Sequence, residues 1–448
     1  MVKAQKIGLE IHIYPKTAGK MFCTCSADFL NSPPNSNICP ICAGQPGSKP
    51  MGPNRSCIVA GVQIARQFSM KLSGKPVGTM RKHYFYPDLP SNYQRTAEPL
   101  ATGGKIGEVA LREIHWEEDP GQYDLTGGEV DLNRSGVPLL ELVTEPAIRN
   151  GGEARSLLND LLLLLQYLGI SRDEAPFKVD TNISVDGGRR VEVKNINSVS
   201  GVLKALEFEY IRQCDLIDSG IEVEQETRGF DDIGGRTVPM RFKETSEDYR
   251  YMLDPDINPV DLGSIHVPSI ANLFELLSSM KSEGIREADG RTILADSGLL
   301  RAYNMIAGKV PPAFASVFVS RDIKSELNFR KLPSSFLNAP GRLEQLASIA
   351  TDHSAGRLSN QNATKLLRLL FDGSDISSVL SETSGNFAEP DELERVAESV
   401  ISLHPDAAGK YRKGNAQVIN YLVGLCMQEL SGKARANEIL EVLRRRLA

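Results

Sequence analysis

The chain has 448 residues, of which 41% are hydrophobic and 24% charged, and its formal net charge is −6. This length suffices for two to four domains with packed cores, and the composition is that of a globular protein without overall basicity for nucleic acid. No secretory signal opens the chain, and its longest apolar run, 157–170, is broken by polar residues and too short to span a bilayer. We therefore expect a cytoplasmic protein whose thiols stay reduced.

Residues 1–265 mix strand patterns with turns that are rich in Gly and Pro. Period-two alternation at 6–14, 181–196 and 221–230 predicts strands. Helical patterns follow at 151–169, with Gly169 as its stop, and at 199–220.

The pattern changes after a segment rich in Pro, Gly and Asp at 253–269, and most of the chain beyond this segment is typical of helices. We expect an α+β protein with a mixed or antiparallel sheet. The predicted parts are a cradle domain at 1–265, a helical domain at 266–345 and a small all-helical tail at 346–448. The tail is locally basic, which indicates either contact with a polyanion or a solvated helix face.

Four of the seven cysteines form two close pairs, C-x-C and C-x-x-C, thirteen residues apart. Two such pairs match a tetrahedral zinc site with four thiolates, and this closed ligand shell favours a structural metal. A redox pair or plain buried cysteines remain alternatives, although the turn-rich flanks of the C-x-x-C pair disfavour redox chemistry. The predicted zinc ligands are Cys23, Cys25, Cys39 and Cys42.

Acidic residues interrupt several strand-like segments, where an unpaired buried charge would be costly. Convergence on magnesium would remove that cost, whereas the alternative is that each acid lies on a solvated sheet face. Basic residues near the same strands are candidates for binding nucleotide phosphates, although P-loop and Rossmann motifs are absent. The aromatic segment 81–94 fits either stacking on bases or ordinary core packing.

These segments together resemble one family, the B subunit of the aspartyl/glutamyl-tRNA amidotransferase. The resemblance runs in order along essentially the whole chain and includes IGLEIHI, PNSNICPICAGQPGS, RKHYFYPDLPSNYQ, HWEEDPG, DLNRSGVPLLELVTEP, DTNISV, VEVKNINS, QETRGF, DYRYMLDPD and NYLVGLCMQELSGKARAN.

The resemblance implies an ATP-dependent, glutamine-hydrolysing carbon–nitrogen ligase of the EC 6.3.5 class. Magnesium-ATP would phosphorylate the side-chain carboxylate of Glu-tRNA(Gln) or Asp-tRNA(Asn), and ammonia would then give the amide. The sequence has no evident amidase nucleophile, so ammonia would come from the amidase (A) subunit, with the small C subunit completing a heterotrimer. A longer archaeal relative carries a domain inserted after the cradle, whereas this chain runs straight on, which favours the three-subunit enzyme.

The resemblance also implies roles for individual residues. It assigns magnesium to Glu10, His12, Glu117, Glu118, Asp180 and Glu192, and nucleotide phosphates to Lys178, Lys194, Arg228 and Arg250. Of these, Glu10, His12, Glu118, Asp180 and Lys194 are the predicted catalytic residues. Lys178 stands where the family usually has Arg, and Tyr14 where it usually has Gln. In the tail, tRNA phosphates would meet Lys410, Arg412, Lys413, Lys433 and Arg435.

Two other functions stay open on the sequence alone. The chain could be a non-catalytic tRNA-binding scaffold whose kinase site lies elsewhere in the complex. It could also be a stand-alone ligase for a small acid, which would turn over without tRNA.

Overall fold

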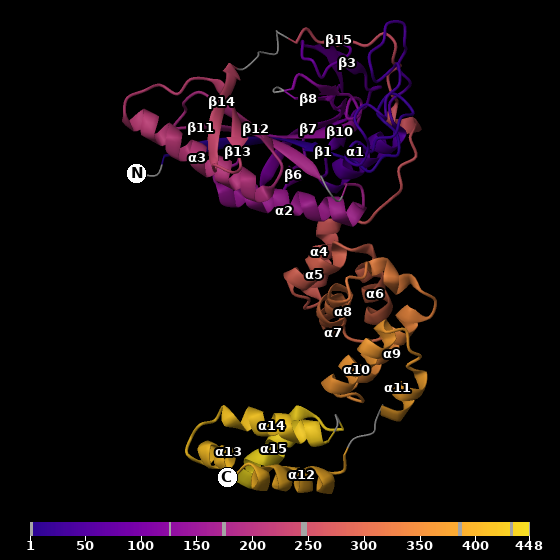
Figure 1. Cartoon of the computed structure of the whole chain (residues 1–448), viewed down its shortest axis with the longest axis vertical. Coiled ribbons are helices and arrows are strands. Elements are labelled where there is room, and N and C mark those ends of the chain that lie inside the picture. Colours follow the sequence, from indigo (N-terminus) through magenta and orange to yellow (C-terminus); the bar gives the residue numbers. More distant parts are fainter. Residues whose placement is uncertain are drawn as a thin grey trace. The chain divides into compact units, whose positions relative to one another are not determined.

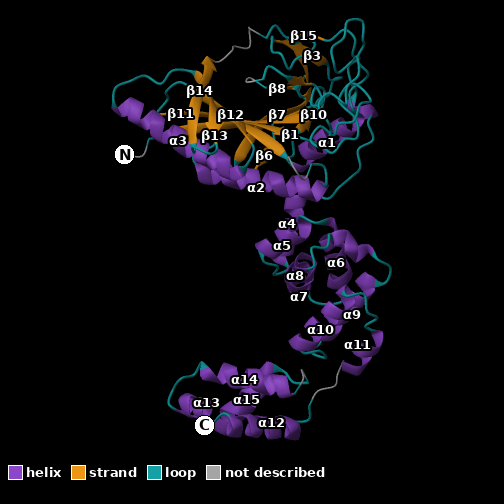
Figure 2. Ribbon diagram, in the orientation of Figure 1, coloured by secondary structure: helices purple, strands orange, loops and turns teal. Residues whose placement is uncertain are grey.

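The computed structural model describes residues 3–124, 127–172, 176–242, 249–383, 388–430 and 433–447. It divides into two compact units, Met1–Phe274 and Glu275–Ala448. The first combines a large mixed sheet with helices and the second is helical, so the predicted α+β class is confirmed (Figure 2). The finer division at 265 and 345 stays a prediction. Within the described ranges, no helix is both long and apolar enough to cross a membrane.

The first unit is built on a sheet whose long central strands run antiparallel, with one parallel pair, β12 and β13. Its main path is β14 (Arg236–Phe242), β13 (Glu226–Asp231), β12 (Val191–Ile196), β11 (Phe177–Val185), β1 (Gln5–Ile13), β10 (Pro138–Thr144), β7 (Val109–Glu118), β4 (Tyr93–Ala97), β3 (Thr79–His83) and β15 (Met252–Leu253). Three short strands join this sheet beside β7: β2 (Lys71–Leu72), β5 (Ala101–Thr102) and β6 (Lys105–Ile106). A separate two-stranded ribbon pairs β8 (Gln122–Tyr123) with β9 (Val130–Asp131).

Three helices pack on the sheet, α1 (Arg55–Gln67), α2 (Gly151–Leu168) and α3 (Val199–Asp218), and α2 and α3 also pack on each other. Figure 1 shows α2 and α3 running along one side of the strands. The predicted stop of α2 is confirmed, because Gly169 caps it in the left-handed conformation, at φ 64°. These helices fix which face of the sheet is the core.

Strand β1 shows how the sequence separates the two faces of the sheet. Its odd-numbered residues from Ile7 to Ile13 are all buried and apolar, as the period-two pattern predicts. Ile13 is paired with Leu140, whose side chain lies against Gly61 of α1, so this set faces the helices. Glu10 and His12 consequently point to the opposite face, where the candidate site lies.

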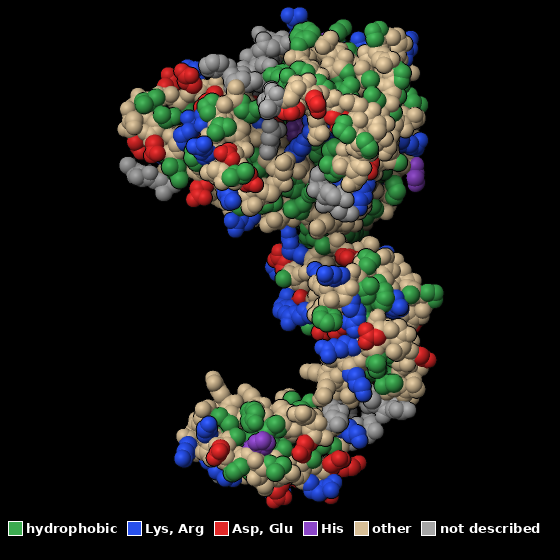
Figure 3. Space-filling view, in the orientation of Figure 1, with side chains coloured by type: hydrophobic (Ala, Val, Ile, Leu, Met, Phe, Trp, Pro, Cys, Tyr) green, Lys and Arg blue, Asp and Glu red, His purple; other side chains and the backbone are tan. Residues whose placement is uncertain are grey.

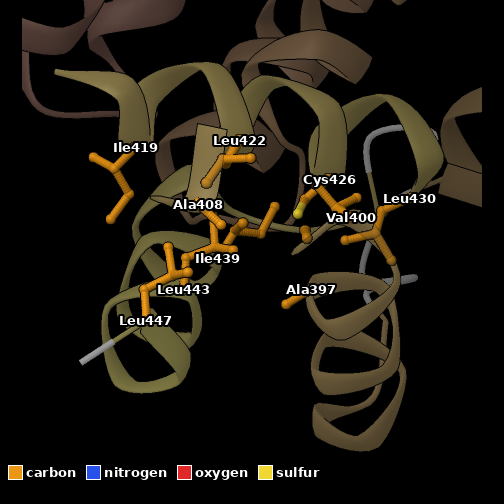
Figure 4. Packing of buried hydrophobic residues seen from close by; sticks show 11 residues of the cluster. Ala397, Val400, Ala408, Ile419, Leu422, Cys426, Leu430, Ile439, Leu443 and Leu447 are labelled. Atoms are coloured by element: carbon orange, nitrogen blue, oxygen red, sulfur yellow. The ribbon is translucent and has the colours of Figure 1, made fainter. Parts of the chain in front are cut away.

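The second unit consists of short helices. They are α4 (Leu273–Ser282, which begins in the first unit), α5 (Glu287–Leu294), α6 (Ser297–Ala307), α7 (Pro312–Val317), α8 (Lys324–Phe329), α9 (Arg342–Ser354), α10 (Asn360–Phe371), α11 (Ser377–Thr383), α12 (Pro390–Leu403), α13 (Pro405–Arg412), α14 (Val418–Glu429) and α15 (Ala436–Leu447). The last four share an apolar core that includes Val400, Leu422 and Leu443 (Figure 4). Cys426 lies in this core as a small apolar side chain.

Candidate active site

Polar side chains from neighbouring strands form a row across the sheet face that the helices leave uncovered. In the strand register, Glu10 lies opposite Asp180, and His12 lies opposite both Lys178 and Glu141. Since side chains on directly paired residues project to the same face, one row collects charges that are far apart in the sequence. The antiparallel register therefore assembles the site.

This row lines a cavity of about 380 Å³. Acidic and basic groups alternate along its wall, together with aromatic and amide side chains. The lining residues are Glu10, His12, Tyr14, Lys82, Tyr84, Asp88, Gln94, Glu117, Asp119, Pro120, Arg134, Leu139, Glu141, Lys178, Asp180, Lys194 and Tyr249.

A first group of acids lies where β1, β11 and β12 meet. One carboxylate oxygen from each of Glu10, Asp180 and Glu192 lies within 4.8 Å of the others, and Lys194 Nζ is 3.1 Å from Asp180 and 3.4 Å from Glu192. Burial raises the pKa of Glu10, and the neighbouring acids, Glu141 first among them, raise it further. Three converging carboxylates with a single ammonium group form an oxygen-rich ligand set suited to a divalent cation such as Mg²⁺.

A second group lies where β1, β10 and β7 meet. Ligand atoms of His12, Glu117 and Glu141 lie within 4.8 Å of one another. His115 Nε2 lies behind them, 2.7 Å from Glu141 and 3.4 Å from Glu117. Burial opposes the charged form of His115, but Glu141 and Glu117 outweigh it and raise its pKa to about 10. Two carboxylates and one imidazole also suit a divalent cation.

Basic groups that could hold phosphate line the same cavity: Lys82, Arg134, Lys178 and Lys194. Burial lowers the pKa of Lys178, whose ammonium group lies 5.4 Å from the centre of the Tyr14 ring. Lys82 Nζ lies 4.7 Å from the centre of the Tyr249 ring. Half-buried cations beside carboxylates that could bind a metal are the kind of arrangement that phosphoryl transfer uses.

Glu118, a predicted magnesium ligand and catalytic residue, is not among the residues that line the cavity. It follows Glu117 on β7, so its side chain projects to the other side of the strand. There its Oε1 accepts hydrogen bonds from the backbone N–H and from Nη1 of Arg95, both at 3.1 Å. Arg95 in turn donates to Asp254, whose side chain is fully buried. Glu118 therefore belongs to an internal ion-pair network.

Two predicted phosphate ligands are also not among the residues that line the cavity. The Arg228 guanidinium is bound to Glu209 at 3.0 Å, to Glu226 at 3.1 Å and to the Thr237 hydroxyl at 2.8 Å. Arg250 is exposed, with φ of 44°, and its backbone oxygen lies 3.1 Å from His83 Nδ1. Of the predicted phosphate ligands, Lys178 and Lys194 are the two that the fold brings to the cavity.

Sequence reasoning missed several residues of the cavity. Glu141 interrupts the apolar run LLELV and could have been found by the criterion used for the other strand acids. Lys82 and Tyr84 lie in the aromatic segment, and both contribute to the cavity wall. Tyr14, the departure from the family pattern, donates a hydrogen bond of 2.8 Å to Asp119 Oδ2. Arg134 lies in the family motif DLNRSGVPLLELVTEP but was not singled out from it.

The four predicted zinc ligands come together outside the cavity. The Sγ atoms of Cys23, Cys25, Cys39 and Cys42 lie within 4.8 Å of one another, and all four cysteines are free thiols. A hydrogen bond from Cys23 lowers the pKa of Cys42 to about 4, and the Lys20 ammonium, 3.4 Å from Cys42 Sγ, acts in the same direction. Four soft sulfur donors at this spacing fit a tetrahedral zinc ion, and they leave no ligand position for a substrate.

The five predicted tRNA ligands of the tail are all exposed. Three of them, Lys410, Arg412 and Lys413, follow one another at the end of α13, while Arg435 is paired with Glu438 at 3.5 Å. Figure 3 shows Lys and Arg side chains on the visible face of the tail, interspersed with acidic and hydrophobic ones.

A sheet-based cavity with two groups of acids and four Lys and Arg side chains in or beside its wall has the chemistry that suits phosphate-bearing ligands and divalent metals. Comparison with known families shows to which family the chain belongs. Residues 5–267 match the family described as the GatB/GatE catalytic domain, and residues 302–447 match the GatB domain. The chain belongs to this family, and the resemblance seen in its sequence motifs is confirmed.

Similar proteins span the full length of the chain. A protein of Methanothermobacter thermautotrophicus is 39% identical over 99% of this chain and 100% of its own length. Relatives from Methanopyrus kandleri and Methanobrevibacter smithii are 38% and 36% identical and cover 99% and 98% of this chain, each over 98% of its own length. All three are named as the B subunit of an aspartyl/glutamyl-tRNA(Asn/Gln) amidotransferase.

Proposed function

We propose that this chain is the kinase subunit of a glutamine-dependent tRNA amidotransferase. It transfers the γ-phosphoryl group of ATP to the side-chain carboxylate of glutamate on tRNA(Gln) or aspartate on tRNA(Asn), releasing ADP. Ammonia then attacks the acyl phosphate, phosphate leaves, and the amide remains on the tRNA. Phosphorylation is needed because a carboxylate is a poor electrophile, and phosphate is a good leaving group.

The observation that carries this proposal is the presence of two acid groups and four half-buried cations in or beside one cavity. When bound, magnesium would neutralise charge on the phosphate oxygens. The acid groups would hold it through Glu10, Asp180 and Glu192 on one side and through His12, Glu117 and Glu141 on the other. Lys178 and Lys194 would hold and orient the phosphates, since phosphoryl transfer depends mainly on positioning and electrostatics.

The proposal includes partners and a location. The amidase (A) subunit would supply ammonia, the small C subunit would complete the heterotrimer, and the basic end of α13 would bind the phosphate backbone of the misacylated tRNA. Zinc at the four cysteines would be structural. We place the protein in the cytoplasm because its cysteines are unpaired thiols, which persist in a reducing compartment.

The test is reconstitution with the two partner subunits, with Glu-tRNA(Gln) and Asp-tRNA(Asn) assayed separately. We expect ATP consumption that depends on charged tRNA, and we expect Glu10→Gln to abolish it while tRNA binding persists. If Glu10→Gln left amidation intact, the chain would be a scaffold for a kinase site elsewhere. ATP turnover on a small acid without tRNA would instead indicate a stand-alone ligase.

A further inference from the structure

Arg134 lines the cavity at the end defined by Tyr14, Asp119 and Lys178. Its Nε lies 3.3 Å from Asp119 Oδ2 and donates to the Pro120 carbonyl at 3.0 Å, while Nη2 donates to the Gly121 carbonyl. Within the described part of the chain, Nη1 has no hydrogen-bond partner. The guanidinium is thus held rigidly by one edge, and part of its donor capacity is left for a ligand.

At this end of the cavity, Arg134 and Lys178 lie near two carboxylates, Asp119 and Asp88. Arg134 and Lys178 are close enough to repel each other. Burial is the main cause of the lowered pKa of Lys178, and the charge of Arg134 lowers this pKa further. Asp119 is not reserved for Arg134, because it also accepts a hydrogen bond from the Tyr14 hydroxyl. The donor capacity left at Nη1 of Arg134 can meet an anionic ligand, and a phosphate oxygen matches the planar donor geometry of arginine.

The segment that carries Arg134, residues 131–137 (the arginine loop), is bound to residues 19–54 (the cysteine-rich loop) on both sides of the arginine. Asn133 is fully buried; its Nδ2 donates to the Pro33 carbonyl at 2.6 Å, and its Oδ1 accepts from Asn37 N at 2.8 Å. The Ser135 hydroxyl donates to the Cys42 carbonyl at 2.9 Å. Residues 133 and 135 therefore face the cysteine-rich loop, whereas residue 134 between them faces the cavity.

Further contacts extend this attachment to the whole arginine loop. Lys20 is buried, and its ammonium group bridges the Leu132 carbonyl at 3.2 Å and Cys42 Sγ at 3.4 Å. The backbone N–H of Met21 donates to the Gly136 carbonyl at 2.7 Å. Gly136 has φ of 82°, and a Cβ there would lie 3.5 Å from Cys42 Cβ, so the two loops are in close contact. Cys42 and its neighbours support the arginine loop directly.

We propose that Arg134 is a phosphate-binding residue of the kinase site and that the cysteine-rich loop positions it through Asn133 and Ser135. This inference rests on the proposed function and extends it to a residue that the sequence motifs did not single out. It gives the zinc-binding fold a defined effect on the reaction, since Cys42 is one of the four zinc-site cysteines and also the acceptor for Ser135.

The phosphate could belong to ATP or to the 3′ end of the tRNA, and kinetics separate these sources. In the reconstituted complex we expect Arg134→Ala to raise the KM of one substrate by about 10- to 100-fold, the range for one charge-assisted hydrogen-bond pair. An effect on ATP alone indicates a nucleotide phosphate, and an effect on tRNA alone indicates the tRNA backbone. Arg134→Lys should recover part of this loss because it keeps the charge without the planar fork.

Asn133→Ala tests the positioning by the cysteine-rich loop. It removes both side-chain contacts to that loop without touching a zinc ligand, so we expect zinc content to be unchanged. The KM of the substrate that Arg134 binds should rise by about 3- to 10-fold, with little change in kcat. Asn31→Ala is the matched control, since the Asn31 side chain is exposed and bonds to Asp28 within the same loop. It should match the wild type.

Calorimetric titration of the intact complex with a non-hydrolysable ATP analogue gives a readout independent of turnover. Unchanged KM values for both substrates and unchanged analogue affinity in Arg134→Lys and Arg134→Ala would overturn the assignment of Arg134. Normal KM values in Asn133→Ala, with zinc retained, would overturn positioning by the loop. If the wild-type complex consumed no ATP with either tRNA, the proposed function itself would fail.

Discussion

Two adjacent glutamates on β7, Glu117 and Glu118, provide a sharp test of the site, because the sequence alone treats them alike and the fold does not. We consider the isosteric changes Glu117→Gln and Glu118→Gln, each of which removes one negative charge. Glu117 lies in the cavity beside His12 and Glu141, whereas Glu118 is bound to Arg95 on the other side of the strand. One change should therefore affect the reaction and the other the stability.

The cost of Glu118→Gln follows from its contacts. The amide oxygen can still accept from the Arg95 backbone, but the charge facing the guanidinium is lost. Arg95 keeps Asp254 at 2.9 Å, so the arginine is not left unpaired, and the loss is that of one charged hydrogen bond, about 2 kcal/mol. Glu117→Gln should change stability by less than about 1 kcal/mol, because His115 keeps Glu141 at 2.7 Å.

Trp116, the one tryptophan of the chain, is buried on β7 next to both residues, so its fluorescence reports unfolding of this unit. With a urea dependence of about 2 kcal/mol per M, Glu118→Gln should lower the unfolding midpoint by about 1 M. Glu117→Gln should instead weaken magnesium-dependent ATP turnover by about 100-fold or more, since it removes a proposed metal ligand. Lost turnover at unchanged stability in Glu118→Gln would refute this reasoning and restore Glu118 to the reaction.

Three further predictions concern other parts of the chain. Cys39→Ser should lose stoichiometric zinc by elemental analysis, while Cys57→Ser, at a buried thiol outside the cluster, should retain it. Burial raises the pKa of Asp254, but hydrogen bonds from Arg81, Asp256 N–H and Arg95 outweigh burial and lower the pKa. The stabilisation from the ionised Asp254 is therefore present above about pH 4 and is lost as the pH falls towards the folded-state pKa. Asp254→Asn should remove this pH-dependent part of the unfolding free energy, measured by urea unfolding between about pH 5 and pH 2. Replacing Lys410, Arg412 and Lys413 with Ala should weaken tRNA binding and reduce the slope of log K against log salt by about 2, and an unchanged slope would exclude this segment from the phosphate contacts.

The sequence predicted the two layers of the first unit well, because burial on one side imposes a strict alternation on each strand. Strand β1 is the clearest case, with apolar residues towards the helices and Glu10 and His12 away from them. The same alternation separates Glu117 from Glu118, but the pattern HWEED does not say which of the two faces the cavity. That choice depends on the register of β7 with β10, a long-range property.

Arginine positions were hardest to predict, since a long charged side chain serves ion pairs inside the fold as readily as it serves ligands. Arg228 on strand β13 follows the family motif, yet it is paired with Glu209 on helix α3. Arg134 reaches the cavity only because two loops distant in sequence are hydrogen-bonded to each other. No local pattern encodes either outcome, because each is decided by contacts between segments many residues apart.

The charge balance of the cavity leads to a last prediction, on how ATP binds. Its wall carries six carboxylates, Glu10, Asp88, Glu117, Asp119, Glu141 and Asp180, against four Lys and Arg cations. This excess of negative charge repels the phosphates of free ATP, and together with burial, the larger cause, neighbouring acids raise the pKa of Glu10. Divalent cations in the two acid groups would reverse the sign, so nucleotide affinity should depend steeply on magnesium.

We therefore expect calorimetric titration to detect no ATP binding when magnesium is chelated, and an affinity that keeps rising after magnesium exceeds the amount needed to saturate ATP itself. Glu141→Gln should reduce this further rise in ATP affinity, which depends on magnesium bound to the protein. The change removes a ligand from one acid group and leaves the other group in place. Equal ATP affinity with and without magnesium would mean that Lys82, Arg134, Lys178 and Lys194 suffice to hold the phosphates. The cost of burying the carboxylates together would then have to be offset by their ion pairs with Lys194 and His115 rather than by metal.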